Sequence, residues 1–269
     1  MTGSDTWDIA GHSVAQRRRF QEIMNLLFEN GFATVEELVD KLGVSRMTVH
    51  RDLDELQARG SLMKVRGGAT AARTENFESS WRYRRNEHLD WKLAIARQAI
   101  ELVEPGDSII IDPSTTGHVF SSLLHEKTPL KVVTPSLPVI ADLTNVSGIE
   151  LHAIGGIFDP HFNCFMGANA EDEACKYRVD KVFMSMAAVN GRTICHSEAR
   201  AIALDRKLFD AAREHILMFD SSKLGHTALH VFGDASEWQW AITDGHGDAA
   251  RLDELRAAGP QVIVAATPN

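Results

Sequence analysis

Cysteine and long apolar runs are the scarcest features of this sequence. Its three cysteines, Cys164, Cys175 and Cys195, are odd in number and contain no Cys-x-x-Cys pair, which argues against a disulfide framework. No apolar run approaches the ~20 residues that a membrane-spanning helix needs, and no secretory apolar stretch follows a basic start. We therefore expect a cytoplasmic protein without a membrane partner.

Positive charge is also in short supply, with 28 Lys and Arg against 37 Asp and Glu and a formal net charge of −9. For a nucleic-acid partner, however, the distribution of charge matters more than its sum. Residues 1–70 carry nine basic and ten acidic side chains, and residues 41–66 carry six basic against three acidic ones. The acidity is therefore concentrated in the remainder of the chain, and residues 41–66 are locally positive.

Residues 34–69 hold two short helical periods that are separated by a tight polar turn. An apolar stripe at three- and four-residue spacings runs through residues 35–42, and Gly43 ends it because glycine readily adopts the left-handed conformation. Ser45 is a favoured N-cap for a second helix over residues 46–59. The pattern predicts a helix-turn-helix whose turn is Gly43-Val44-Ser45.

The start of the second predicted helix carries hydroxyl and nitrogen donors, and its acids come later. Such donors suit phosphate oxygens and base edges, and helix-turn-helix proteins dock this end of the helix in the major groove. A merely solvated polar face is the alternative. Residues 62–66 alternate apolar and basic before Gly67-Gly68, which predicts a wing. The expected DNA-binding residues are Ser45, Arg46, Thr48, His50, Arg51, Lys64 and Arg66.

The length of 269 residues and a 44% hydrophobic composition are sufficient for two cores. Within the first domain, the run Arg17-Arg18-Arg19 either contacts DNA phosphates or forms a solvated face. The polar segment before the second domain contains Phe77, Trp81 and Tyr83, which we expect to anchor it against a neighbouring domain or subunit. The predicted organisation is a flexible N-terminus (1–13), a winged helix-turn-helix (14–70), a linker (71–90) and an effector-sensing α/β domain (91–269).

From residue 91 onward, apolar strand-like runs alternate with helical periods. This alternation predicts a mostly parallel sheet that is covered on both faces, with ligands bound outside the carboxyl ends of its strands. The residues directly after the predicted strands are small, hydroxylated or acidic, which suits an anion or sugar hydroxyls, although N-capping is the alternative. The expected effector-binding residues are Asp112, Ser114, Thr115, Thr116, Thr134, Ser136, Gly155, Gly156, Glu198, Asp220 and Lys223.

Neither a metal centre nor a nucleophilic active site is expected. His226 and His230 are four residues apart and Cys195 precedes His196, but no spaced set of carboxylates or thiols accompanies them. No Ser/His/Asp order or nucleophile elbow is present. We therefore expect no metal, no cofactor and no catalytic residue.

The stretch SRMTVHRDLDELQARGSLMKVRGGA resembles the N-terminal signature of the DeoR family of bacterial transcriptional regulators. Residues 91–245 are similar to the DeoR-type sensor domain in the segments KLAIA, IIIDPSTT, VVTPS, IGG and DSSK. The resemblance implies a sensor fold similar to those of ribose-5-phosphate isomerase and coenzyme A transferases. In the family this domain binds phosphorylated sugars.

The leading hypothesis is a DNA-binding regulator, a repressor of a carbohydrate-catabolism operon that a sugar phosphate or similar polyhydroxylated anion releases from double-stranded operator DNA. A DNA-binding domain that is close to neutral overall makes few contacts with DNA. We therefore expect a dimer or tetramer, which brings at least two such domains to the operator. One alternative is a sugar-phosphate isomerase-like enzyme with a DNA-binding appendage. Another is a binding or scaffolding module that does not bind DNA.

Overall fold

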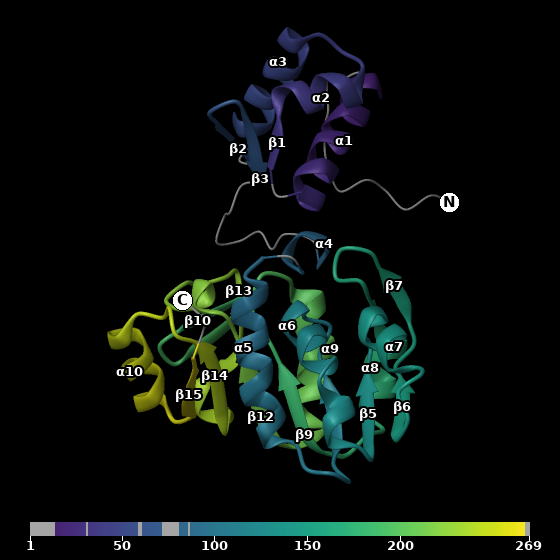
Figure 1. The fold of residues 1–269 in the computed structure, drawn as a ribbon, viewed down its shortest axis with the longest axis vertical. Helices are drawn as coiled ribbons and strands as arrows, with labels where there is room; N and C mark the ends of the chain where they lie inside the picture. The colour runs from purple at the N-terminus through teal and green to yellow at the C-terminus, as the bar shows by residue number, and fades with distance from the viewer. Residues whose placement is uncertain (1–13, 31, 59–60, 72–80, 86, 267–269) are drawn as a thin grey trace. The chain divides into compact units, whose positions relative to one another are not determined.

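The chain divides into two compact units, Met1–Thr74 and Glu75–Asn269 (Figure 1). The computed structural model describes residues 14–30, 32–58, 61–71, 81–85 and 87–266. The expected flexible N-terminus, residues 1–13, lies outside these ranges. Each unit has a hydrophobic core of its own, in agreement with the expectation of two cores.

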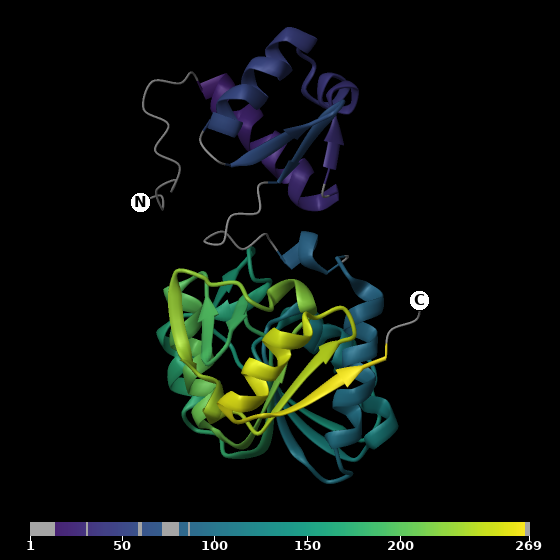
Figure 2. The ribbon, with the colours of Figure 1, turned by 90° about the vertical axis from the view of Figure 1, so that its left-hand side faces the viewer.

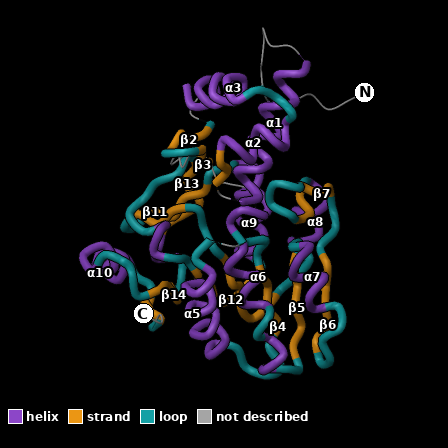
Figure 3. Tube along the Cα trace, turned by 45° about the horizontal axis from the view of Figure 1, so that its top comes forward, coloured by secondary structure: helices purple, strands orange, loops and turns teal. Residues whose placement is uncertain are grey.

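Three helices and a small antiparallel sheet make up the first unit (Figure 3). Ile23, Leu27, Leu38 and Leu53 from all three helices are fully buried and form the centre of its core. The third strand pairs with both of the others in antiparallel register, as in a wing. The elements are α1 (Val14–Asn30), β1 (Phe32–Thr34), α2 (Val35–Leu42), α3 (Arg46–Ala58), β2 (Leu62–Val65) and β3 (Gly68–Ala71).

Local signals define the turn between α2 and α3. Thr34 caps α2 in a reciprocal capping box with Glu37. Gly43 follows α2 with φ 63°, a left-handed conformation that glycine adopts without strain. Ser45 Oγ accepts a hydrogen bond from the Thr48 amide at 3.2 Å and so caps α3. The predicted winged helix-turn-helix is therefore confirmed.

A seven-stranded, fully parallel sheet forms the centre of the second unit. Ile109 and Ile111 face the layer of α5, α6 and α7, whereas Ile110 faces the layer of α8, α9 and α10 and the small sheet β10-β11-β13 (Figure 2). The prediction of a mostly parallel sheet covered on both faces is confirmed. The helices are α4 (Trp81–Arg84), α5 (Leu89–Ala99), α6 (Thr115–Ser121), α7 (Leu137–Leu143), α8 (Ala168–Ala174), α9 (Ala199–Asp210) and α10 (Ala249–Ala258).

The order of the central sheet is β15-β14-β12-β9-β4-β5-β6, so the direction of strand addition reverses between β4 and β9. In open parallel sheets such a reversal leaves a crevice at the carboxyl ends of the two strands. The strands of this sheet are β4 (Ser108–Ile111), β5 (Leu130–Thr134), β6 (Ile149–Ala153), β9 (Val179–Met184), β12 (Ala212–Met218), β14 (Trp240–Asp244) and β15 (Gln261–Ala265).

Two small antiparallel sheets of the second unit were not part of the predicted fold. Their strands are short, and a period of two residues is hard to recognise over three or four residues. They are β7 (Ile157–Asp159) with β8 (Cys164–Met166), and β10 (Ala188–Asn190), β11 (Thr193–His196) and β13 (His230–Asp234).

Trp81 belongs to the second unit and is only 3% exposed. Its amide donates to the His161 carbonyl at 2.8 Å, and its ring meets the His118 ring of α6 edge-on at 5.3 Å. The expected linker, residues 71–90, therefore ends in ordered structure from residue 81, and buried Trp81 is not available to a partner subunit. Phe77 and the side chain of Tyr83 lie outside the described part of the chain.

Candidate functional site

The outer face of α3 is a shallow concave surface, which we call the α3 face. Its side chains come from Met47, Thr48, His50, Arg51 and Asp54. The opposite side of the helix buries Val49, Leu53 and Leu56 against the core of the unit. Three of the expected DNA-binding residues, Thr48, His50 and Arg51, thus share one accessible surface.

The other expected DNA-binding residues differ in their surroundings. Arg46 is ion-paired with Glu36 of α2, and Lys64 is ion-paired with Asp54 of α3. Ser45 caps α3, and its hydroxyl lies 2.9 Å from the Thr48 hydroxyl. Arg66 is exposed in the turn between β2 and β3.

The arginine run of α1 divides into residues with different roles. Arg19 points into the unit and pairs with Asp52, whereas Arg18 pairs with Glu22 along the exposed side of the helix. Arg17 is exposed. The sequence offered only a phosphate contact or a solvated face for this run, and Arg19 has neither role.

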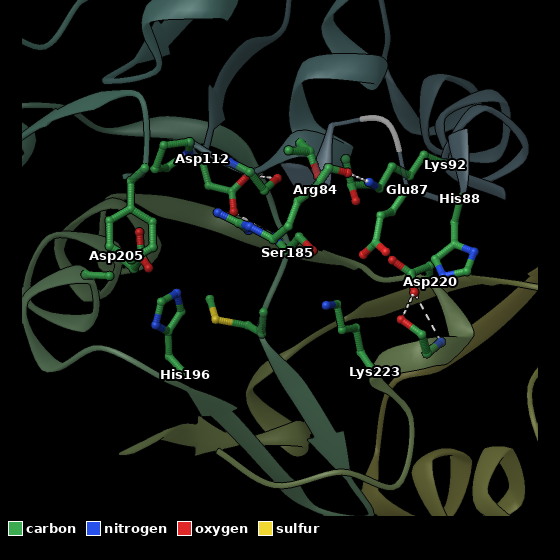
Figure 4. Close-up of a pocket in the computed structure, with 18 of the residues that line it drawn as sticks. Arg84, Glu87, His88, Lys92, Asp112, Ser185, His196, Asp205, Asp220 and Lys223 are labelled. Carbon is green, nitrogen blue, oxygen red and sulfur yellow. Dashed lines mark hydrogen bonds between the residues drawn. The ribbon is translucent and has the colours of Figure 1, made fainter. Parts of the chain in front are cut away.

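A pocket lies in the second unit at the reversal of strand order (Figure 4). Residues after β4, β9 and β12 form its floor, and the segment before and at the start of α5 forms one wall. Its lining is Arg84, Glu87, His88, Lys92, Asp112, Pro113, Ser114, Thr115, Thr116, Phe162, Met166, Ser185, Met186, His196, Ala201, Asp205, Asp220, Ser222 and Lys223.

Asp112 ties the two central strands together at the bottom of this pocket. Its Oδ1 accepts from the Ser114 hydroxyl at 2.5 Å, and its Oδ2 accepts from the Ser185 amide at 2.8 Å. Burial raises the pKa of Asp112 to about 7, although these hydrogen bonds oppose the rise. Gly117 lies in the first turn of α6, where a Cβ atom would come within 2.8 Å of Asp112 Oδ1. This position therefore requires glycine.

Three cationic side chains converge on the pocket. Lys92 of α5 is 3% exposed, and its ammonium donates to the Arg84 carbonyl. Burial lowers the pKa of Lys92 to about 8; Asp220 opposes this shift, and the positive charges of Arg84 and Lys223 add to it. The side chains of Arg84 and Lys223 reach toward the middle of the pocket in Figure 4. The arrangement suits an anionic group.

His196 and Asp205 line the side of the pocket opposite Lys92 (Figure 4), and Phe162 also belongs to the lining. The Glu198 amide donates to His196 Nδ1 at 3.1 Å, so a neutral His196 ring carries its proton on Nε2. An imidazole N–H and a carboxylate can donate to and accept from sugar hydroxyls.

Six expected effector-binding residues line the pocket, and five do not. Thr134 and Ser136 follow β5, and Gly155 and Gly156 follow β6, strands that lie beyond β4 on the side away from the reversal. Glu198 is paired with Arg200 at 3.6 Å. The six lining residues are Asp112, Ser114, Thr115, Thr116, Asp220 and Lys223.

Thr134 instead has a structural role. Its hydroxyl donates to the Ile111 carbonyl at 2.8 Å and accepts from the Ser136 amide at 3.1 Å. The first bond connects the end of β5 to the end of β4, and the second holds the turn that follows β5. The hydroxyl at this strand end therefore stabilises the sheet edge next to the pocket.

Sequence reasoning missed the wall that Arg84, Glu87, His88 and Lys92 provide, because this segment reads as a linker followed by an ordinary helix. Lys92 did offer a signal, as a lone cation next to the apolar run Leu93–Ala96. Ser185 directly follows β9, so the strand-end rule would have selected it only if the end of that strand had been placed at Met184. Phe162, His196 and Asp205 could not have been found in this way, because they lie in the loop between β7 and β8, in the short strand β11 and within α9, not directly after a strand of the central sheet.

Among the described residues, no group of three or more His, Cys, Asp or Glu side chains is placed to hold a metal ion. In the same part of the chain, no helix combines the length and apolar character that crossing a membrane requires.

Two family models match the chain. The DeoR-like helix-turn-helix domain matches residues 19–75, and the DeoR C terminal sensor domain matches residues 87–245. The chain is 32% identical to the lactose phosphotransferase system repressor of Streptococcus mutans, over 87% of this chain and 94% of that protein. It is 29% identical to the HTH-type transcriptional repressor GlcR of Bacillus subtilis, over 93% and 96% of the two chains.

Among solved structures, ribose 5-phosphate isomerase A from Methanocaldococcus jannaschii is similar to part of the chain. The similarity covers 53% of this chain and 56% of that one, at 19% identity and a TM-score of 0.38.

Proposed function

The chain belongs to the DeoR family of DNA-binding transcriptional regulators, and we propose that it represses a carbohydrate-catabolism operon until a sugar phosphate or similar polyhydroxylated anion releases it from its operator. Both family models and the names of its relatives support this function. Because its partner is DNA, we expect it to act in the cytoplasm.

The convergence of Arg84, Lys92 and Lys223 is the observation that carries the effector half of this proposal. A buried cation such as Lys92 is unfavourable unless a counter-charge reaches it. A phosphate would supply that charge, while Asp205 and His196 could bind hydroxyls. One molecule that combines the two is a sugar phosphate.

The wall of the pocket suggests how the effector affects DNA binding. Arg84 lies in the segment that follows the connection to the first unit, and Trp81 is packed against α6, whose first residues, Thr115 and Thr116, also line the pocket. An anion held by Arg84 and α6 would therefore act on the segment that leads to the DNA-binding domain. We infer that this segment transmits the signal.

A single α3 face presents few donors, which supports a dimeric regulator that binds two half-sites. Sedimentation analysis of the full chain tests this part, and a monomer at the concentration that saturates operator DNA would contradict it.

The proposal is tested by a thermal-shift screen of sugar phosphates, followed by operator titrations with the compound that raises Tm most. By linkage, an effector that weakens operator binding must itself bind less tightly when operator is present, by the same factor. Calorimetry with and without operator measures that factor. Equal effector affinities in the two titrations would show that the pocket does not control DNA binding.

The isomerase alternative has no support among the relatives, which are named as transcriptional repressors. Its direct test is turnover of ribose 5-phosphate by the full chain. We expect none above the rate of a Lys223→Ala variant.

A further inference from the structure

Met47 is the most exposed large apolar side chain of those described, at 80%. It lies in the first turn of α3, between Arg46 and Thr48. Single exposed apolar residues are common on protein surfaces, so exposure alone assigns no role. Its position on the α3 face does.

The α3 face follows the helical repeat. Met47, His50, Arg51 and Asp54 are spaced at i, i+3, i+4 and i+7, so they form one stripe opposite the buried side of α3. Met47 occupies the N-terminal end of that stripe. In a docked helix-turn-helix, this end of the second helix meets the base edges.

Polar neighbours cannot replace Met47 at this end of the stripe. Arg46 is held by Glu36, and the Ser45 and Thr48 hydroxyls are 2.9 Å apart and hydrogen-bonded to each other. A thioether side chain has no hydrogen-bond donor, so against a polar base edge it would leave buried groups unsatisfied. The one apolar group that the major groove offers is the 5-methyl group of thymine.

We propose that Met47 is a specificity-determining residue that contacts a thymine 5-methyl group in each half-site of the operator. The inference rests on the proposed DNA-binding function and adds a base contact to it. His50 and Arg51, the next residues of the stripe after Met47, would supply the polar contacts. The flexible thioether adapts its shape to the methyl group.

The test starts from a duplex that the full chain selects from random sequence. Each thymine of one half-site is replaced in turn by deoxyuridine, which removes only the methyl group. Binding is then measured by fluorescence anisotropy. For wild type we expect one position at which this replacement weakens binding about fourfold, as burial of one methyl group predicts. For Met47→Ala we expect no further loss at that position.

Met63→Ala is the matched control, because Met63 is also exposed, at 51%, but lies on β2 outside the α3 face. It should respond to each deoxyuridine as wild type does. If Met47→Ala and wild type lose the same affinity at every position, the methyl contact does not exist. If Met47→Ala weakens all sequences equally, Met47 contacts the DNA backbone and the proposal is wrong. If no sequence is selected at all, the DNA-binding function itself fails, together with this inference.

Discussion

Arg19 of α1 and Asp52 of α3 form a two-pronged ion pair, with Nε to Oδ2 at 2.6 Å and Nη2 to Oδ1 at 3.1 Å. Asp52 is fully buried, and its hydrogen bond raises the pKa of Arg19. The pair links α3 to α1 within the same unit. It also takes Arg19 out of the set of residues that could contact DNA phosphates.

Removing one member of the Arg19–Asp52 ion pair should therefore make α3 easier to unfold. Arg19→Ala leaves a buried carboxylate without its counter-charge, and we expect it to lower the local free energy of unfolding by about 3 kcal/mol. Hydrogen exchange of the α3 amides measures this loss. Arg18→Ala is the control, because its exposed pair with Glu22 is worth at most about 0.5 kcal/mol. Similar losses in both variants would contradict the assignment.

The two arginines of α3, Arg46 and Arg51, should differ in their effects on DNA binding. Arg51 lies on the accessible α3 face, so Arg51→Ala should weaken operator binding by about 1 to 3 kcal/mol if it contacts a base. Arg46→Ala should cost less, because Arg46 must first leave Glu36. Gel-shift titrations of both variants on a selected site test the ranking. If Arg51→Ala binds as tightly as wild type, the α3 face does not enter the groove.

Salt dependence should distinguish the two cations of the wing. Exposed Arg66 is free to neutralise a phosphate, so Arg66→Ala should flatten the slope of log affinity against log salt by about one unit on every sequence. Lys64 is already neutralised by Asp54, so Lys64→Ala should change the slope less. Anisotropy titrations over a range of salt concentrations give both slopes. A larger change for Lys64→Ala would mean that its pair with Asp54 opens on DNA.

Buried Lys92 should lower the stability of the ligand-free protein and raise its affinity for the effector. Lys92→Met removes a buried charge, so we expect a higher Tm without ligand and a loss of the ligand-induced rise in Tm. Lys223→Ala should lower affinity for the sugar phosphate by about 2 kcal/mol, as expected for one charge-assisted hydrogen bond. Lys176→Ala is the control, because Lys176 pairs with Glu173 and does not line the pocket. If Lys92→Met keeps the ligand-induced rise in Tm, Lys92 does not bind the anion.

Effector affinity should fall as pH rises from 7 to 9. The pKa of Asp112 is raised to about 7 and that of Lys92 is lowered to about 8, both chiefly by burial. Through this range the pocket therefore gains a negative charge and loses a positive one, and each change repels an anion. Calorimetry of the wild-type protein at several pH values should show both steps. An affinity independent of pH would contradict the roles of both groups.

Without ligand, Asp112 and Lys92 should also make the free energy of unfolding depend on pH, and their two contributions should change in opposite directions. Between about pH 4 and 7 folded Asp112 keeps a proton that the unfolded chain releases, so its contribution to stability falls as pH rises. Between about pH 8 and 10.5 folded Lys92 has released a proton that the unfolded chain keeps, so its contribution rises with pH. Denaturation of Lys92→Met should lack the second effect.

Much of the architecture could be read from the sequence, because local signals specify it. Gly43 and Ser45 mark the turn of the helix-turn-helix through their own backbone and capping preferences. All seven strands of the central sheet, from β4 to β15, lie in the region from residue 91 onward in which strand-like runs and helical periods alternate. The alternation of strands and helices was enough to predict a parallel sheet with a ligand site at its carboxyl edge.

Only the tertiary structure decided which strand ends meet. The loops after β4, β5 and β6 were all expected to bind the effector, but only the first lies at the reversal of strand order, which depends on how helices far apart in the chain pack over the sheet. The same holds for Arg84, which follows the Trp81 that packs on α6, and for Lys92, whose helix α5 packs on the central sheet. It also holds for Arg19, which turns inward to Asp52. Periodicity and capping act over a few residues. These pairings are set by burial and charge between residues distant in the chain, which a single sequence does not encode in any local pattern.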